Sequence, residues 1–232
     1  MAEQPAGGEV YVDELAEAAL ATVENDMLIG IGAGRTTARF VAELGARVKD
    51  GLDIQVVAGS LHTEQRCREA GLTVLDFATV DRLDLLLDGA DEVDPQMRML
   101  KGSRGAIARE RILAWAADHA LYAVRGHKLS ECVGTNAALS VAVMPFGLAS
   151  TRAAVGRAGL NGVVRLDMDG AFLVTDNGNL ILDVALSGDE DFEQLGAELN
   201  AIPGVIEHGL FIGEADTILV EHDDGSIERL ER

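Results

Sequence analysis

Apolar and polar positions follow two alternating periods along the first 134 residues of the chain. Short apolar runs, bounded by glycine or polar turn residues, predict strands that are buried on both faces. Between them, apolar residues recur three and four positions apart, as they do on one face of a helix. The predicted strands cover residues 27–32, 54–58, 73–75, 83–87 and 120–124. The predicted helices cover residues 13–24, 38–48, 61–70 (with Ser60 as N-cap) and 106–117. This alternation predicts an α/β fold with a Rossmann-like, mostly parallel sheet.

The pattern changes after about Gly134. Strands are predicted at 142–145, 163–168, 171–175 and 179–184, and helices at 148–158 and 191–200. Asp169-Gly170, between two strand-like runs, predicts a hairpin. We therefore expect a smaller α+β domain at residues 135–204, inserted into a larger domain formed by residues 1–134 and 205–232. Strands at 210–212 and 217–221 are expected to return to the main sheet.

Composition excludes several classes of partner. The 232 residues carry a formal net charge of −20, which disfavours nucleic acid and anionic membranes as partners. No apolar run approaches the roughly 18 residues of a membrane span. The first ten residues lack the basic and apolar regions of a signal peptide. Cys67 and Cys132 have no partner at metal-ligand spacing, so we expect two reduced thiols, no structural zinc and a cytoplasmic protein.

The candidate chemistry is concentrated between Leu83 and Glu110. Asp88 and Asp91 follow a predicted buried strand, and their like charges need compensation by solvent, a cation or a substrate. Lys101 then precedes a glycine-rich turn that leads into a predicted helix, an arrangement able to hold an anion. The acidic turn is open to three interpretations: a solvated loop, a divalent-metal site without calcium-loop spacing, or general acid–base work on a sugar.

Two residues of this region are open to a structural or a chemical interpretation. Glu110 lies on the apolar face of its predicted helix, where it either pairs with Arg109 or Arg111, or has a raised pKa suited to proton abstraction. Lys101 is one of only three lysines, the others being Lys49 and Lys128, against 16 arginines. Because an ammonium group is a compact charge of tunable pKa, Lys101 and Lys128 are candidates for specific roles.

A first glycine-rich loop covers residues 30–37, between a predicted strand and helix. It departs from the spacing G-x-G-x-x-G, and no acidic residue ends the second predicted strand, so a dinucleotide site is disfavoured. A phosphate or sugar loop that uses backbone donors and the Thr36 hydroxyl is one alternative. A tight turn that needs glycine only for packing is the other.

Taken together, these segments resemble the A-type ribose-5-phosphate isomerases. The resemblance extends over nearly the whole chain and is carried by motifs at residues 88–95 (DGADEVDP), 101–102 (KG), 109–110 (RE), 175–179 (TDNGN) and 202–211 (IPGVIEHGLF). Motifs that occur in order along the whole chain are more specific than a shared fold.

The resemblance implies isomerisation of ribose 5-phosphate and ribulose 5-phosphate through an enediolate, in the non-oxidative branch of the pentose phosphate pathway. Glu110 would be the base, Lys101 would stabilise the enediolate oxygen, and Asp88 and Asp91 would hold sugar hydroxyls and assist ring opening. No metal or organic cofactor is implied, and the partners are a sugar phosphate and further copies of the chain in a homodimer or homotetramer. The implied substrate-binding residues are Gly32, Ala33, Gly34, Arg35, Thr36, Gly102, Ser103, Arg104 and Lys128.

The binding loops differ from the family pattern at Ala33, Arg35, Ser103, Arg104, Arg125 and His127. The three arginines among them could replace lost phosphate donors. They could equally select another phosphorylated sugar or a sugar acid. A non-catalytic protein that senses sugar phosphates is a third alternative, although it would leave the acid–base residues unexplained.

Overall fold

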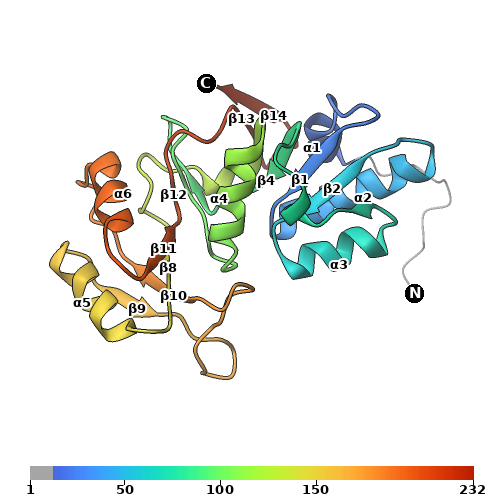
Figure 1. The fold of residues 1–232 in the computed structure, drawn as a ribbon. Helices are drawn as coiled ribbons and strands as arrows, with labels where there is room; N and C mark the ends of the chain where they lie inside the picture. The colour runs from blue at the N-terminus through green and yellow to red at the C-terminus, as the bar shows by residue number, and fades with distance from the viewer. Residues whose placement is uncertain (1–12) are drawn as a thin grey trace, which may run out of the picture.

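The computed structural model describes residues 13–232, which are built around a seven-stranded sheet (Figure 1). Its strand order is β14-β13-β7-β4-β1-β2-β3. Neighbouring strands are parallel except for the terminal pair β13 and β14. The α/β prediction is therefore confirmed. The strands are β1 (Leu28–Ile31), β2 (Gln55–Ala58), β3 (Thr73–Val74), β4 (Leu85–Asp88), β7 (Ala120–Arg125), β13 (Thr217–Glu221) and β14 (Ile227–Glu231).

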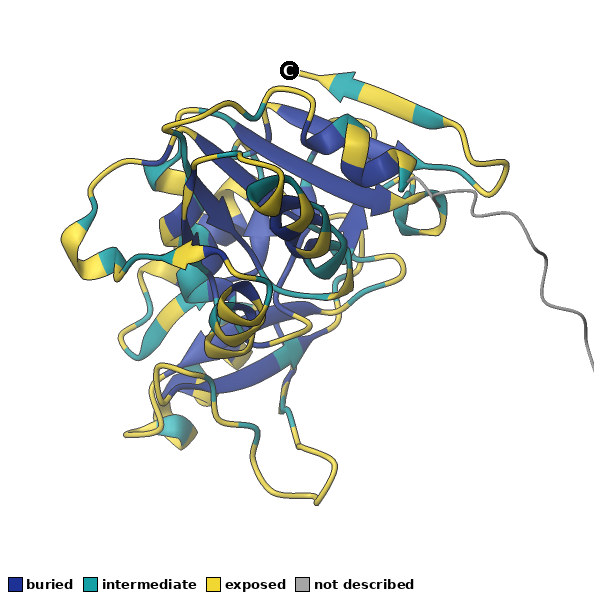
Figure 2. Cartoon of the chain, turned by 90° about the vertical axis from the view of Figure 1, so that its right-hand side faces the viewer, coloured by how far each residue is buried: buried dark blue, intermediate teal, exposed yellow. Residues whose placement is uncertain are grey.

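Helices cover both faces of this sheet, and the alternation along β4 divides its core in two. Successive strand residues point to opposite faces. Leu85 and Leu87 thus pack with Phe40 of α2, whereas Leu86 packs with Leu113 of α4. Buried residues accordingly follow the strands, while the outer faces of the helices are exposed (Figure 2). The helices are α1 (Glu14–Ala19), α2 (Arg35–Lys49), α3 (Leu61–Glu69) and α4 (Ile107–Ala116).

A second, antiparallel sheet has the strand order β11-β8-β10-β9 and packs with two helices around its own core. It lies on the other side of α4 from the parallel sheet (Figure 1). The elements are β8 (Leu139–Val143), α5 (Leu148–Arg157), β9 (Gly162–Val164), β10 (Leu180–Val184), α6 (Phe192–Asn200) and β11 (Val205–His208). A third sheet, of order β12-β6-β5, joins β5 (Glu92–Val93), β6 (Met99–Leu100) and β12 (Leu210–Phe211).

The return of residues 210–212 to the main sheet was predicted wrongly. Leu210 and Phe211 form β12, which pairs with β6 next to Lys101, and only β13 joins the parallel sheet. Residues 205–208 also pair with β8 in the antiparallel sheet. The chain therefore leaves that sheet only after His208, and the domain boundaries at 134 and 204 stay a prediction.

Some predicted elements differ in extent. The Asp169-Gly170 turn forms, but residues 171–175 contribute only isolated bridges, at Phe172 and Val174, instead of a strand. Helix α2 begins at Arg35 rather than at 38, because Gly34, with a φ of 126°, starts it directly after the loop. Ser60 caps α3 as predicted, accepting a hydrogen bond from the Thr63 amide. Among the helices of residues 13–232, none is both long and apolar enough to cross a membrane.

Candidate active site

Three side chains from different elements meet at the carboxyl end of β4. Asp88 is the last residue of β4, Lys101 directly follows β6, and Glu110 lies in the first turn of α4. The Lys101 Nζ lies 2.8 Å from Asp88 Oδ2 and 3.4 Å from Glu110 Oε1. Each residue is at most 3% exposed. The site therefore holds one cation between two carboxyl groups, away from water.

The backbone around Asp88 fixes this arrangement. The Gly89 amide donates to Asp88 Oδ1 at 2.7 Å, and Lys101 Nζ donates to the Gly89 carbonyl. A side chain at Gly32 would collide with the Asp88 carboxyl group. The glycine of the first loop is thus needed so that β1 and β4 can bring this carboxyl group against the backbone. For Gly32, the packing interpretation is the one that the structure supports.

Burial sets the protonation of the three groups. It raises the pKa of Glu110 to about 8, with a further rise from the charges of Asp88 and Asp91, while Lys101 opposes the shift. Burial likewise raises the pKa of Asp88. Burial disfavours the charge of Lys101, but Asp88 and Glu110 outweigh it and raise its pKa. The raised pKa brings protonation of Glu110 close to neutral pH, the range in which a general base is most effective.

A cavity of about 120 Å³ opens above these groups and brings the two predicted loops together. The Glu110 Oε2 atom has no hydrogen-bond partner within residues 13–232. Asp91 accepts hydrogen bonds from the Ser103 amide, at 2.9 Å, and from the Ser103 hydroxyl. We call this space the catalytic cavity. Of the predicted site residues, Gly32 and Asp88 do not line it. The others do: Ala33, Gly34, Arg35, Thr36, Asp91, Lys101, Gly102, Ser103, Arg104, Glu110 and Lys128.

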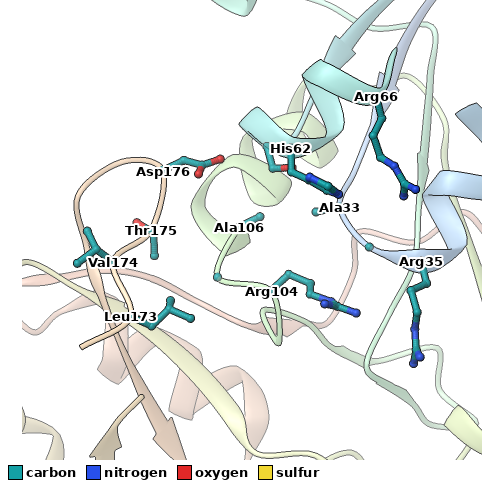
Figure 3. A pocket seen from close by; sticks show the side chains of 13 residues that line it. Ala33, Arg35, His62, Arg66, Arg104, Ala106, Leu173, Val174, Thr175 and Asp176 are labelled. Atoms are coloured by element: carbon teal, nitrogen blue, oxygen red, sulfur yellow. The ribbon is translucent and has the colours of Figure 1, made fainter. Parts of the chain in front are cut away.

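Two larger cavities adjoin the catalytic cavity and share residues with it. The first, which we call the Lys128 cavity, measures about 280 Å³ and is also lined by Arg35, Thr36 and Arg125. The second, the Arg66 cavity, measures about 330 Å³ and shares Arg35 and Arg104 with the catalytic cavity (Figure 3). The catalytic cavity therefore has two neighbouring cavities, and each of them is lined by cationic side chains.

Several predicted partnerships are corrected by the structure. Lys101, rather than Arg109 or Arg111, is the partner of Glu110. Arg109 donates to Asn177 and Arg111 pairs with Glu207 and Glu214.

One of the three arginines that could replace phosphate donors has an acidic partner. Arg125 lies 3.3 Å from Glu221, which in addition pairs with Arg39, but it is exposed and lines the Lys128 cavity, so its role stays a prediction. Lys128 has no carboxylate within ion-pair distance in the described part of the chain. Lys128 and Arg35 thus line this cavity without an acidic partner among the described residues.

Sequence reasoning missed the aromatic surroundings of Lys101. Its Nζ lies 5.3 Å from the ring centroid of Tyr122 and 5.7 Å from that of Phe211. Both rings are fully buried, and ring faces stabilise a nearby cation. The signal for Tyr122 was its place in β7, directly beside Asp88 in the strand register. Within residues 13–232, no group of three or more His, Cys, Asp or Glu side chains is arranged to hold a metal ion.

The fold and this site define an α/β enzyme with a buried carboxyl group and a buried ammonium group beside a polar cavity. Comparison with known proteins specifies the class further. The family model for ribose 5-phosphate isomerase A (phosphoriboisomerase A) matches residues 55–225. The ribose-5-phosphate isomerase A of Rhodopseudomonas palustris (strain HaA2) is 41% identical over 225 residues, which cover 94% of this chain and 96% of that protein.

Solved structures agree with this relationship. The ribose 5-phosphate isomerase A of Methanocaldococcus jannaschii has a TM-score of 0.88 at 29% identity, covering 94% of this chain and 96% of that one. A D-ribose-5-phosphate isomerase in complex with phospho-erythronic acid has a TM-score of 0.89 at 32% identity, covering 96% and 100%. The chain belongs to the ribose 5-phosphate isomerase A family, and it is an isomerase.

Proposed function

We propose that this protein interconverts ribose 5-phosphate and ribulose 5-phosphate through an enediolate, with Glu110 as the base. Family membership supports the reaction. The observation that carries the mechanism is the free Oε2 atom of Glu110, buried at the cavity while the other carboxylate oxygen faces Lys101. A carboxylate held in this way has one oxygen available for a substrate proton.

The proposed reaction begins from the open-chain aldose. The Glu110 carboxylate takes the proton from C2, the C1 carbonyl becomes an enediolate oxygen, and Lys101 stabilises its negative charge. Glu110 then returns the proton to C1 while the C2 hydroxyl proton moves to the C1 oxygen, which leaves a ketone at C2. Asp88 and Asp91 hold sugar hydroxyls and assist the ring opening that precedes these steps.

The substrate phosphate is proposed to lie in the Lys128 cavity. Helix α2 has no side-chain cap, so its first amide groups, near Thr36, are available to an anion. Lys128 adds a cation at the same cavity. Because the catalytic cavity measures only about 120 Å³, a pentose phosphate must extend beyond it.

The test of this function is replacement of Glu110 by Gln, which keeps the shape of the side chain and removes the base. We expect turnover of ribose 5-phosphate to fall at least about 1,000-fold, while calorimetry shows that the substrate still binds. Glu69→Gln, on the exposed face of α3, is the matched control and should retain full activity. Undiminished turnover in Glu110→Gln would contradict the mechanism. In D₂O the ribulose 5-phosphate formed should carry deuterium at C1, which a hydride shift would not produce.

We also propose that the chain forms homodimers or homotetramers. Large apolar side chains are exposed together on β9 and the following turn, at Val163, Leu166, Met168 and Phe172, and such patches commonly mark interfaces. Light scattering on the eluted protein tests this, and a monomer at all concentrations would contradict it. An inserted domain at residues 135–204 and a location in the cytoplasm complete the proposal.

A further inference from the structure

Arginines without an ion-pair partner are unevenly distributed in this acidic molecule. Ten of the 16 arginines lie within 4.0 Å of a carboxylate oxygen in the described structure. The six that do not, among residues 13–232, are Arg35, Arg66, Arg104, Arg152, Arg157 and Arg232. Three of these six, the first three, line a single cavity. All three are exposed, and in a chain with a net charge of −20 they give this cavity positive surroundings that would attract an anion.

Four cationic or potentially cationic side chains reach this Arg66 cavity from three separate elements. Arg66 and His62 come from α3, Arg35 from the start of α2, and Arg104 from the loop before α4 (Figure 3). Arg66 and Arg104 extend toward the Ala33–Arg35 loop from opposite sides in this view. The Arg35 side chain extends away from Arg66, so the three guanidinium groups line the cavity without meeting at one point (Figure 3). Each guanidinium group suits the bidentate binding of phosphate oxygens.

The acidic groups at this cavity do not neutralise the arginines. Asp176 is the only carboxylate that lines it in the described part of the chain. Its Oδ2 accepts a hydrogen bond from the Leu61 amide at 2.8 Å and lies 3.7 Å from Arg109 Nη1. Asp176 therefore holds the 173–176 loop to the beginning of α3, and the cavity keeps a local excess of positive charge.

The wall opposite the arginines is largely apolar. Ala106, Leu173 and Val174 line it, with the side chains of the latter two on the 173–176 loop (Figure 3). The volume of about 330 Å³ falls in the range of small-molecule sites, about 300–1,000 Å³, which the catalytic cavity does not reach. A cationic wall that faces an apolar wall fits a ligand with a phosphate at one end and a flat ring at the other.

We propose that the Arg66 cavity is a second anion site that binds a nucleoside phosphate, with the phosphate on Arg66, Arg104 and Arg35 and the base against Leu173 and Val174. The site adjoins the Lys128 cavity, where the substrate phosphate is proposed to lie, and shares only Arg35 with it. Arg35 and Arg104 also line the catalytic cavity, so a phosphate that draws them toward Arg66 removes them from the sugar. Occupancy therefore inhibits the isomerase.

Calorimetric titration with adenosine monophosphate tests the site without reference to turnover. Arg66→Gln should weaken binding of this probe at least about 10-fold, the loss expected for one charge-assisted phosphate contact. Arg68→Gln is the matched control, because Arg68 lies on the same helix, pairs with Glu64 and does not line the cavity; it should bind like the parent protein. Adenosine, which has no phosphate, should bind far more weakly. Absence of binding by the parent protein, or equal binding by Arg66→Gln, would overturn the proposal.

Kinetics then distinguishes an effector site from a part of the substrate site. We expect adenosine monophosphate to inhibit the parent protein and Arg68→Gln but to inhibit Arg66→Gln at least about 10-fold less, with the KM for ribose 5-phosphate unchanged. A KM that rises in Arg66→Gln as much as the Kd for the probe would place the substrate phosphate here and overturn the proposal. So would loss of probe binding in Lys128→Ala with full binding in Arg66→Gln. If the protein turns over no ribose 5-phosphate, the titration still decides the matter.

Discussion

At the scale of single residues, the surroundings of Glu110 destabilise the ionised form of its carboxyl group. The group is buried, faces two other carboxyl groups and has one favourable partner, Lys101. The same desolvation that makes the charge costly makes the carboxylate a stronger base, because it binds a proton near neutral pH instead of near pH 4.5. Function and stability therefore place opposite demands on this side chain.

Activity should depend on pH through this group. We expect kcat/KM for ribose 5-phosphate to rise with pH and to level off above an apparent pKa of about 8, since in the proposed mechanism only the ionised Glu110 accepts the C2 proton. Asp91→Asn should move this limb to lower pH, because it removes a negative charge that raises the pKa of Glu110. Initial rates from pH 5 to 9.5 measure both effects. A profile already flat from pH 5.5 would contradict the assignment of Glu110 as the base.

Stability should show the opposite dependence. The pKa of Glu110 is higher in the folded protein than in the unfolded chain, so the folded state binds the extra proton between about pH 4.5 and 8 and loses stability as pH rises through that interval. At pH 8.5, Glu110→Gln should therefore be more stable than the parent protein by a free energy of unfolding on the order of 2–5 kcal/mol, and it should unfold at a higher temperature. This difference should shrink toward pH 5. Thermal unfolding of both proteins across this range gives the answer. An equal difference at every pH would show that ionisation of Glu110 is not its cause.

At the scale of elements, the short strands position the chemistry. Strands β5 and β6 cross back over the end of β4 and deliver Lys101, and β5 also carries Glu92, a buried carboxylate outside the catalytic cavity. Glu92 accepts hydrogen bonds from the amides of Gly134, Asn136 and Ala137 at 2.9–3.1 Å. It thereby holds the loop by which the chain passes from the parallel to the antiparallel sheet.

Removing the Glu92 carboxylate should destabilise the protein, although Glu92 does not line the catalytic cavity. Glu92→Ala leaves three partly buried hydrogen bonds without their acceptor, so we expect the free energy of unfolding to fall by about 3 kcal/mol. Glu69→Ala, on an exposed helix face, is expected to change it by less than about 0.5 kcal/mol. Urea denaturation of the two variants compares them. A loss below about 1 kcal/mol in Glu92→Ala would mean that water replaces the carboxylate.

Elements with a clear apolar pattern could be predicted from the sequence, whereas the pairing of the shortest strands could not. Strands β1, β2 and β4 and helices α3, α4 and α6 were recognisable because their apolar positions repeat locally. Strands β5 and β6 have two residues each, which is too few to show a period. β12 was predicted as a strand but assigned to the wrong sheet, because its pairing depends on contacts between residues far apart in the chain. β14 was missed because charged residues occupy three of the five positions of this edge strand.

The same distinction applies to the site. The predicted acidic, lysine and glycine-loop residues do meet at one cavity, since the carboxyl ends of parallel strands share one edge of the sheet. The partner of Glu110 was predicted wrongly, because it depends on side-chain directions and not on spacing. Arg66 and His62 belong to no motif, and only the packing of α3 beside the catalytic loops brings them to a cavity.

At the scale of the whole molecule, the net charge of −20 opposes compaction, and the exposed ion pairs compensate it only weakly. Salt should therefore stabilise the protein by screening repulsion between distant carboxylates. We expect the Tm to rise by several degrees between 10 mM and 500 mM NaCl at pH 7.5. Thermal unfolding in choline chloride separates screening from specific sodium binding. If screening is the cause, choline chloride and NaCl should raise the Tm equally. A Tm that falls with salt would show that the ion pairs outweigh the repulsion.

The pairing of β6 with β12 also has a consequence for how the protein is made. The Lys101 amide donates to the Gly209 carbonyl, and Phe211 covers the Lys101 ammonium group. On the ribosome, the segment from Asp88 to Glu110 emerges long before residues 209–211, and domains fold in the order in which they are synthesised. The nascent chain therefore carries the proposed catalytic residues in an unassembled state while residues 111–208 are synthesised. The site should therefore form only late in synthesis, when β12 has emerged from the ribosome and packs beside Lys101.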